Sequence, residues 1–218
     1  MHYAAGTPGK TAVNEENPIV YVIDDDASVR KALERLLRSA GYHAVVFASA
    51  VEFLGYTIPD VPGCLVLDIK MPQLNGLQLQ ERLAQRNICL PVIFITGHGT
   101  VPDSVKAFKA GAMDFLQKPF DDKDFLETVS RGIEMHRRLL REEKKLQILR
   151  TRLETLTLRE REIFGLVTTG MLNKQIAFDL GISEKTVKVH RARVMQKMDA
   201  QSLADLVRFA ETLGIVPR

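Results

Sequence analysis

Residues 19–26 read IVYVIDDD, five apolar side chains followed directly by three aspartates. A short apolar run with no polar alternation is typical of a strand that is buried on both faces, as strands of parallel sheets are. Three carboxylates at the end of such a strand repel one another and need a cation nearby. This stretch therefore predicts a buried strand whose carboxyl end carries a charged site.

Further short apolar runs alternate with stretches of helical periodicity along the next hundred residues. The apolar runs are residues 43–47, 64–67, 91–95 and 114–116. The helical patterns between them include residues 29–37, 77–83 and 105–110. Five strands and about five helices in alternation predict a doubly wound α/β domain with a five-stranded parallel sheet, whose ligand site lies at the carboxyl ends of the strands.

From residue 121 onward the sequence is wholly helical in pattern. Residues 121–124 can cap a helix, and no proline interrupts the chain from there to Thr157, so a long helical linker is expected. Five leucines in it have the spacing of a two-heptad seam: Leu139, Leu146, Leu149, Leu153 and Leu156. Such a seam either joins two copies of the chain or packs on the chain's own domains, and two heptads do not decide between them.

The last part of the chain has the pattern of a small helical bundle. Thr157 and Glu160 have the spacing of a capping box. Three helices are expected after it, at residues 173–180, 184–198 and 202–213. The tight turn at 181–183, with Ser183 as an N-cap, gives the first two the spacing of a helix-turn-helix.

The second helix of this pair is basic on one side. Val187, Val194 and Met198 recur at helical spacing and are expected to face the core. The outward positions carry Lys185, Lys188, Arg191, Arg193 and Lys197. A basic helix alone is usually a solvated surface, but after a tight turn and another helix it indicates contact with DNA phosphates and base edges.

Charge is divided unevenly over the 218 residues. Residues 1–140 carry 15 basic and 17 acidic side chains, and residues 141–218 carry 15 basic and 10 acidic ones. The net charge changes sign, which makes an anionic partner plausible for the C-terminal part. The two cysteines, Cys64 and Cys89, have no partner at metal-ligand spacing, so neither a disulfide framework nor a zinc site is expected.

The chain has no apolar run of the roughly 18 residues that a membrane span needs. Residues 1–17 have no secretory signal pattern and are rich in small and polar residues, which predicts a disordered tail. We therefore expect a cytoplasmic protein without a membrane partner.

The aspartates define the site that this fold leads us to expect. Asp24, Asp25 and Asp26 follow the first strand and Asp68 follows the third, so they converge at one edge of the sheet. Hard oxygen ligands in small number suit Mg²⁺, which is often shared with phosphate oxygens. Asp68 is the candidate nucleophile toward phosphorus, while Thr96 offers a hydroxyl and Lys118 an ammonium.

Residues 18–135 resemble the receiver domain of two-component signalling, which has a flavodoxin-like fold. The motifs that carry the resemblance are residues 22–26, 67–72, 75–76, 95–97 and 115–120. The resemblance implies that a partner histidine kinase phosphorylates Asp68. It also implies that Thr96 and Lys118 contact the phosphoryl group and that Phe115 changes rotamer with Thr96. The implied Mg²⁺ ligands are Asp24, Asp25, Asp68 and the Lys70 carbonyl, with Asp24 acting mostly through water.

Two positions qualify this resemblance. Phe115 stands where many receivers have tyrosine, so it has no hydroxyl to pair with the backbone in the active state. Lys70 and His98 lie two residues after Asp68 and Thr96, where they affect access of water to an acyl phosphate.

Residues 155–218 resemble the LuxR-type helix-turn-helix, and the whole chain is similar to the FixJ-like branch of the FixJ/NarL family. The motifs are residues 156–162, Gly170, 173–177, 180–183 and 186–190, and residues 136–154 form the expected linker. The resemblance implies promoter DNA and RNA polymerase as partners, homodimerisation, and packing of His190 against the first helix of the motif. The DNA contacts that resemblance and charge together indicate are Asn173, Lys174, Lys185, Thr186, Lys188, Val189, Arg191, Arg193 and Lys197.

Three alternatives compete with this interpretation. A phosphatase with an aspartate nucleophile would have a second aspartate two residues after Asp68, where this chain has Lys70, so we do not expect an enzyme. A ligand-sensing LuxR regulator would lack the acidic sheet edge. A switch that works without phosphorylation would not need the complete set of Asp24, Asp25, Asp68, Thr96 and Lys118.

Overall fold

The computed structural model describes residues 17–97 and 111–215. The predictions for residues 1–16, for the helix at 105–110 and for His98 lie outside the described residues. The chain forms two compact units, residues 1–140 and residues 141–218, and the division falls inside the segment expected as a linker.

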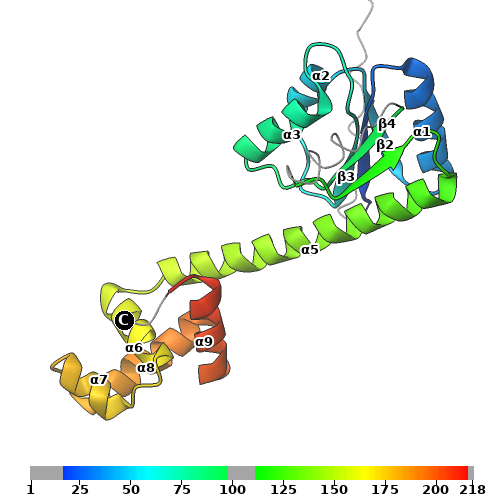
Figure 1. Ribbon diagram of the computed structural model, residues 1–218. Helices are drawn as coiled ribbons and strands as arrows, with labels where there is room; N and C mark the ends of the chain where they lie inside the picture. Colours follow the sequence, from blue (N-terminus) through cyan, green and yellow to red (C-terminus); the bar gives the residue numbers. More distant parts are fainter. Residues whose placement is uncertain (1–16, 98–110, 216–218) are drawn as a thin grey trace, which may run out of the picture. The chain divides into compact units, whose positions relative to one another are not determined.

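The N-terminal unit is built on a parallel sheet (Figure 1). The sheet has five strands in the order β2-β1-β3-β4-β5. The strands are β1 (Ile19–Ile23), β2 (His43–Phe47), β3 (Gly63–Asp68), β4 (Val92–Thr96) and β5 (Asp114–Gln117). Every residue of β1, β3 and β4 is buried, as expected for central strands that are covered on both faces. The predicted fold class is confirmed.

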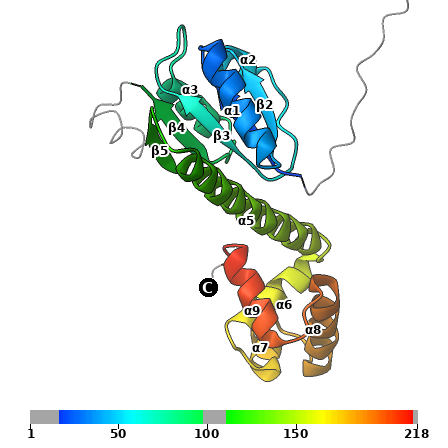
Figure 2. The ribbon, with the colours of Figure 1, turned by 90° about the vertical axis from the view of Figure 1, so that its right-hand side faces the viewer.

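Helices cover both faces of this sheet (Figures 1 and 2). The described helices of the unit are α1 (Ala27–Ser39), α2 (Ala50–Leu54), α3 (Gly76–Gln85) and the first part of α5 (Asp122–Glu154). On one face, Phe53 of α2 and Leu79 of α3 belong to the same core cluster as Tyr21. On the other face, Leu37 of α1 and Phe125 of α5 belong to the cluster around Val20 and Val66.

The C-terminal unit is a bundle of short helices (Figure 2). They are α6 (Leu158–Thr168), α7 (Asn173–Asp179), α8 (Glu184–Met198) and α9 (Leu203–Thr212). The predicted capping box is present, because Thr157 accepts a hydrogen bond from the Glu160 backbone while Glu160 accepts one from the Thr157 backbone. Asp199 ends α8 in the left-handed conformation, with φ of 56°.

The linker helix ends at Glu154, the last residue of the segment expected as the linker. Leu149 and Leu156 are buried in the core of the C-terminal unit, and Leu153 packs against the same cluster. These three leucines of the heptad pattern therefore follow the second interpretation, packing within their own domain, because the bundle of α6 to α9 needs them to complete its core.

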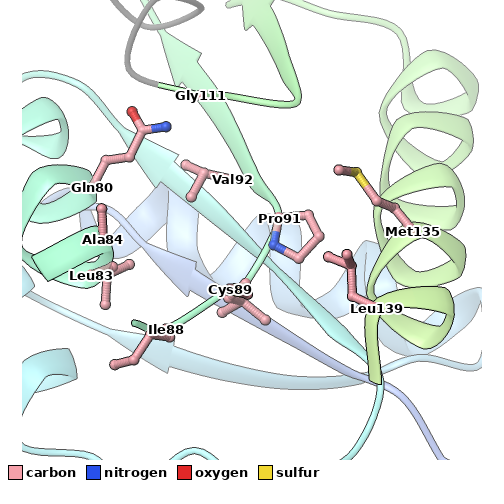
Figure 3. A pocket seen from close by; sticks show the side chains of 11 residues that line it. Gln80, Leu83, Ala84, Ile88, Cys89, Pro91, Val92, Gly111, Met135 and Leu139 are labelled. Carbon is pink, nitrogen blue, oxygen red and sulfur yellow. The ribbon is translucent and has the colours of Figure 1, made fainter. Parts of the chain in front are cut away.

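A small pocket lies beside the start of β4, at the end of the strands opposite to the one that carries the aspartates (Figure 3). Its volume is about 210 Å³. Figure 3 shows Gln80 and Leu83 of α3 on one side of it, and Met135 and Leu139 of α5 on the other. Because β4 carries Thr96 at its far end, this pocket is separate from the acidic site.

Candidate functional site

Four strand ends bring the predicted residues of the N-terminal unit to one edge. Asp24 follows β1, Asp68 ends β3, Thr96 ends β4 and Lys118 follows β5. The parallel register holds these ends level, since Ile23 pairs with Leu67, Asp68 with Ile95, and Thr96 with Gln117. The backbone N–H of Lys118 also donates to the Thr96 carbonyl at 2.8 Å. The sheet itself therefore positions these functional groups.

Lys118 joins the two buried carboxylates of the site. Its Nζ lies 2.6 Å from Asp24 Oδ2 and 3.1 Å from Asp68 Oδ1. Asp24 is 1% exposed and Asp68 7% exposed. One ammonium thus faces two carboxylates that are largely removed from water, which leaves net negative charge at the edge of the sheet.

The pKa values of this group follow from burial and pairing. Burial raises the pKa of the Asp68 carboxyl and the neighbouring Asp24 adds to the rise, so the opposing effect of Lys118 only partly offsets it. Burial alone would lower the pKa of Lys118, but its bonds to Asp24 and Asp68 outweigh this and raise it. Lys118 therefore stays positive at neutral pH.

The three consecutive aspartates have separate environments. Asp24 Oδ1 accepts the Asp26 backbone N–H at 2.9 Å, and the Asp24 carbonyl accepts from Arg30 Nη1 at 2.6 Å. Asp26 caps α1 by accepting the Ser28 backbone N–H at 2.7 Å, which lowers the pKa of Asp26. Asp25 is exposed. Among the three, Asp24 forms the buried wall of the site and Asp25 is open to solvent beside it.

The segment after Asp68 shapes the other side of the site. Asp68 Oδ2 accepts the Lys70 backbone N–H at 2.7 Å, which fixes the orientation of the carboxylate. Gly76 starts α3 directly against this segment, and a Cβ atom built on it would lie 2.5 Å from the Asp68 carbonyl oxygen. Glycine is therefore required by close approach at this position, a role that the Asn75-Gly76 motif did not reveal from sequence.

The predicted switch residues differ in burial. Thr96 is 2% exposed, whereas Phe115 is half-buried and packs against the core cluster on the α2 and α3 face. The Phe115 backbone N–H donates to Asp114 Oδ1 at 2.8 Å. The structure places both residues on adjacent strands near the acidic edge, but their coupled movement stays a prediction.

The donor set at this edge fits a magnesium ion. Among the described residues no group of three or more His, Cys, Asp or Glu side chains has the arrangement of a metal site. Magnesium, however, is usually held by one or two carboxylates, with waters and phosphate oxygens completing the shell. The adjacent carboxylates of Asp24 and Asp68 match that need, and their surplus negative charge favours a cation.

The second site predicted from sequence is the basic face of α8. Val187, Val194 and Met198 are fully buried, as expected for its inner side. Lys185, Lys188 and Arg193 are exposed on the same helix, and so is Val189. The helix begins with the expected N-cap, since Ser183 Oγ accepts the Thr186 backbone N–H at 3.1 Å.

The first helix of the motif, α7, is joined to α8 by a hydrogen bond. Lys174 is exposed, and Asn173 Oδ1 accepts a hydrogen bond from Arg191 Nη1 at 3.1 Å. His190 is half-buried, and its Nδ1 is buried without a hydrogen-bond partner among the described residues. Its packing against the first helix stays a prediction.

Lys197 differs from the other basic residues of α8. Its Nζ lies 2.6 Å from Glu160 Oε2 and 3.0 Å from the Thr155 carbonyl oxygen. Glu160 is 2% exposed. Lys197 thus has partners inside its own unit, which its helical spacing with the other cations did not indicate.

A receiver-like sheet with an acidic, lysine-bridged edge and a basic helix-turn-helix together define a two-domain signalling regulator. Residues 20–130 match the family model of the response regulator receiver domain. Residues 154–210 match that of bacterial regulatory proteins of the luxR family. The chain therefore belongs to the response regulator family of two-component systems, in the group with a LuxR-type DNA-binding domain.

Two relatives and one solved structure that match most of the chain support this assignment. Nodulation protein W of Bradyrhizobium diazoefficiens is 50% identical over 90% of this chain and 87% of its own. Transcriptional regulatory protein FixJ of Rhizobium meliloti is 44% identical over 91% of this chain and 97% of its own. The structure of response regulator StyR has a TM-score of 0.81 at 44% identity, covering 89% of this chain and 98% of that one.

These relationships confirm the expected class of function. The family consists of transcriptional regulators rather than enzymes, with a receiver domain and a DNA-binding domain on one chain. Receiver domains generally bind Mg²⁺ at their acidic pocket. Within the part of the chain that the structure describes, no helix is long and apolar enough to cross a membrane.

Proposed function

We propose that Asp68 accepts a phosphoryl group from a partner histidine kinase and that this modification controls binding of the C-terminal domain to promoter DNA. The observation that carries the proposal is the bridging of Asp24 and Asp68 by Lys118 at 2.6 and 3.1 Å. An anionic acceptor beside a fixed cation is suited to phosphoryl transfer, in which charge stabilisation and positioning dominate.

In the proposed transfer, an Asp68 carboxylate oxygen attacks the phosphorus of a phosphohistidine. The new O–P bond forms as the N–P bond to the imidazole breaks, and the imidazole nitrogen leaves with the bonding pair. Lys118 neutralises the phosphoryl oxygens from its position beside Asp68, and its raised pKa keeps it charged throughout. The backbone N–H of Lys70 holds the other Asp68 oxygen in place.

Magnesium would be held by Asp24, Asp25, Asp68 and the Lys70 carbonyl. When bound, the ion supplies positive charge that offsets repulsion between the carboxylates and an incoming phosphoryl group. The exposed Asp25 lies beside the buried Asp24, which leaves one ligand accessible to solvent. This arrangement suits an ion that keeps several waters.

Thr96 and Phe115 are the proposed switch. A phosphoryl group adds a charge of roughly −1.5 to −2 at Asp68, which draws a nearby hydroxyl toward it. Thr96 ends the strand adjacent to β3, and Phe115 lies on the next strand, so movement of Thr96 changes the space available to the half-buried ring.

The DNA-binding part of the proposal rests on the exposed basic face of α8. The residues proposed to contact DNA are Asn173 and Lys174 of α7, and Lys185, Thr186, Lys188, Val189, Arg191 and Arg193 of α8. Lys197 is outside this set because its ammonium group already has two partners within the domain. We further propose that the phosphorylated protein binds inverted half-sites as a homodimer in the cytoplasm and engages RNA polymerase there.

The decisive experiment measures DNA binding by full-length wild type and Asp68→Asn, with and without acetyl phosphate and Mg²⁺, on a pool of inverted-repeat duplexes. We expect the phosphate donor to tighten binding of wild type only. Equal binding by both proteins would show that the receiver does not act through Asp68. Absence of DNA binding under every condition would contradict the role of the C-terminal domain.

A further inference from the structure

Polar contacts hold the C-terminal end of α8 against the end of α5 and the start of α6. We use the word latch for the four side chains that make them: Arg152, Glu160, Lys197 and Asp199. Lys197 pairs with Glu160 at 2.6 Å and donates to the Thr155 carbonyl at 3.0 Å. Arg152 donates to the Met198 carbonyl at 3.2 Å and pairs with Asp199 at 2.6 Å.

The Lys197 to Glu160 pair is the central part of the latch. Glu160 is 2% exposed, and the same Oε2 atom accepts the Thr157 backbone N–H at 2.9 Å. The capping box of α6 therefore fixes the orientation of the Glu160 carboxylate independently of its pairing with Lys197. A buried carboxylate that is held in one orientation restricts the position of the ammonium that pairs with it.

Arg152 adds a second attachment at the same helix end. The Met198 carbonyl belongs to the last turn of α8, where backbone acceptors lack partners within the helix and favour a cation. Asp199 leaves the helix in a left-handed conformation and presents its carboxylate to the other guanidinium nitrogen. Helices α5 and α6, which lie outside the helix-turn-helix, thus both bind the C-terminal end of its second helix.

Loss of these contacts would change the position of the opposite, N-terminal end of α8, which is the end at which recognition helices contact bases. The 15 residues of the helix span about 22 Å at 1.5 Å per residue. A tilt of about 5° at the latch therefore moves the far end by about 2 Å, which is more than a specific base contact tolerates.

We propose that the latch positions α8 for specific DNA recognition, and that Lys197 acts through Glu160 as a positioning residue instead of contacting phosphate. The proposal rests on the DNA-binding function proposed above. It makes Glu160, an acidic residue on a different helix, as important for specific binding as the cation that it holds.

The test uses the full-length protein with acetyl phosphate and Mg²⁺, and two duplexes of equal length. One is the inverted repeat that wild type selects from a random library, and the other is a scrambled version of it. Dissociation constants are measured over a range of salt concentrations for wild type, Lys197→Met, Glu160→Gln and the double variant. Lys188→Met is the matched control, since Lys188 is an exposed cation of the same helix.

We expect Lys197→Met and Glu160→Gln each to weaken binding to the selected duplex about tenfold, the scale on which removal of a supporting shell acts. Binding to the scrambled duplex and the dependence on salt should stay as in wild type, and the double variant should resemble either single one. Lys188→Met should weaken binding to both duplexes and lower the salt slope by about 0.9.

Several results would overturn the inference. If Lys197→Met weakens binding to both duplexes and lowers the salt slope as Lys188→Met does, Lys197 is a phosphate contact. If Glu160→Gln tightens binding, Glu160 acts only as a charge that repels DNA. Equal weakening on both duplexes without a change of salt slope would indicate a lower folded fraction. For this reason Arg152→Gln, which removes a half-exposed pair, is measured as well and should give a smaller effect on the selected duplex alone. Failure of wild type to bind any duplex would instead contradict the proposed function itself.

Discussion

At the scale of single residues, Asp68 illustrates a conflict between function and stability. Its carboxyl is buried next to Asp24, and both share the ammonium of Lys118. A buried carboxylate with incomplete charge compensation destabilises the folded state, and functional sites often contain such groups. The raised pKa of Asp68 is the sign of this cost.

We expect Asp68→Asn to melt at a higher temperature than wild type at pH 7 in the absence of Mg²⁺. Because the pKa is raised on folding, the ionised form costs stability, and this cost vanishes as the pH falls below the pKa of the unfolded chain. Each kcal/mol regained corresponds to about 2–4 °C for a protein of this size. Thermal melts from pH 7 down to pH 3.5, with exposed Asp25→Asn as control, measure the difference. A lower melting temperature for Asp68→Asn at pH 7 would show that Lys118 fully compensates both charges.

Tyr21 is a second residue with an unsatisfied group. Its side chain is 1% exposed, and its hydroxyl is buried without a hydrogen-bond partner among the described residues. Burial raises the pKa of this hydroxyl well above its usual range. We expect Tyr21→Phe to stabilise the protein by about 1 kcal/mol, because it removes a desolvated polar atom and keeps the ring contact with Phe53. Chemical denaturation measures the change, with the exposed Tyr56→Phe as the neutral comparison, and a destabilised Tyr21→Phe would reveal a bound partner for the hydroxyl.

Sequence patterns located these residues but did not give their environments. The apolar run of β1 placed Tyr21 in a strand, yet nothing in the run indicated that its hydroxyl lacks a partner within the described part of the chain. Strand-end positions brought Asp24, Asp68 and Lys118 to one edge, because parallel topology fixes where strands end. The sharing of one ammonium by two carboxylates depends on side-chain conformations that strand positions do not determine.

At the scale of elements, the agreement with prediction depends on length for the helices and on apolar runs for the strands. The five strands were recognised from their apolar runs, and the helices with several turns have enough residues for helical periodicity to show. Helix α2 has only five residues and was not predicted, although Ser49 caps it by accepting the Glu52 backbone N–H at 3.2 Å. The heptad spacing in α5 did not settle its function, since a seam for a partner and a seam for the chain's own core have the same period.

The start of α3 gives an element-scale prediction. Gly76→Ala would place a Cβ atom 2.5 Å from the Asp68 carbonyl oxygen and 2.9 Å from the Phe94 ring, so α3 must move. We expect a decrease of about 2 kcal/mol in stability and slower phosphorylation by acetyl phosphate. Gly165→Ala in α6, where the added carbon has no atom within 4 Å other than those of its own stretch of helix backbone, should instead stabilise by up to about 1 kcal/mol. If Gly76→Ala is phosphorylated at the wild-type rate, α3 does not control the geometry at Asp68.

The junction of α6 and α8 gives a second prediction at this scale, which concerns the pH dependence of stability. Bonds to Lys197 and to the Thr157 backbone lower the pKa of Glu160 to about 2. Its contribution to stability is therefore complete above the unfolded pKa near 4.5 and disappears as the pH falls toward 2. Glu160→Gln should destabilise the C-terminal domain by about 2 kcal/mol at pH 7 and by progressively less below pH 4.5. Denaturant titrations at several pH values, followed by a probe in the C-terminal domain, test this, and a difference that does not depend on pH would exclude the ion pair as its cause.

At the scale of the whole molecule, charge is separated between the two halves of the chain. Residues 1–140 have two more acidic than basic side chains, and residues 141–218 have five more basic than acidic ones. Phosphorylation makes the first half more negative still, whereas DNA requires the second half to stay positive. The same overall charge of +3 would tell little about a partner if it were spread evenly.

This separation predicts that the position of a positive charge matters for DNA binding more than the number of charges. We compare two double variants that remove equal charge: Lys185→Gln with Arg193→Gln on α8, and Lys31→Gln with Arg35→Gln on the exposed side of α1. The α8 variant should lower the slope of log K against log salt by about 0.9 for each phosphate that its cations no longer neutralise, and the α1 variant should leave the slope unchanged. Fluorescence anisotropy between about 50 and 200 mM salt, a range in which phosphate neutralisation strongly affects affinity, gives both slopes. Equal effects of the two variants would mean that net charge alone attracts DNA, and that the exposed face of α8 is not where the phosphates bind.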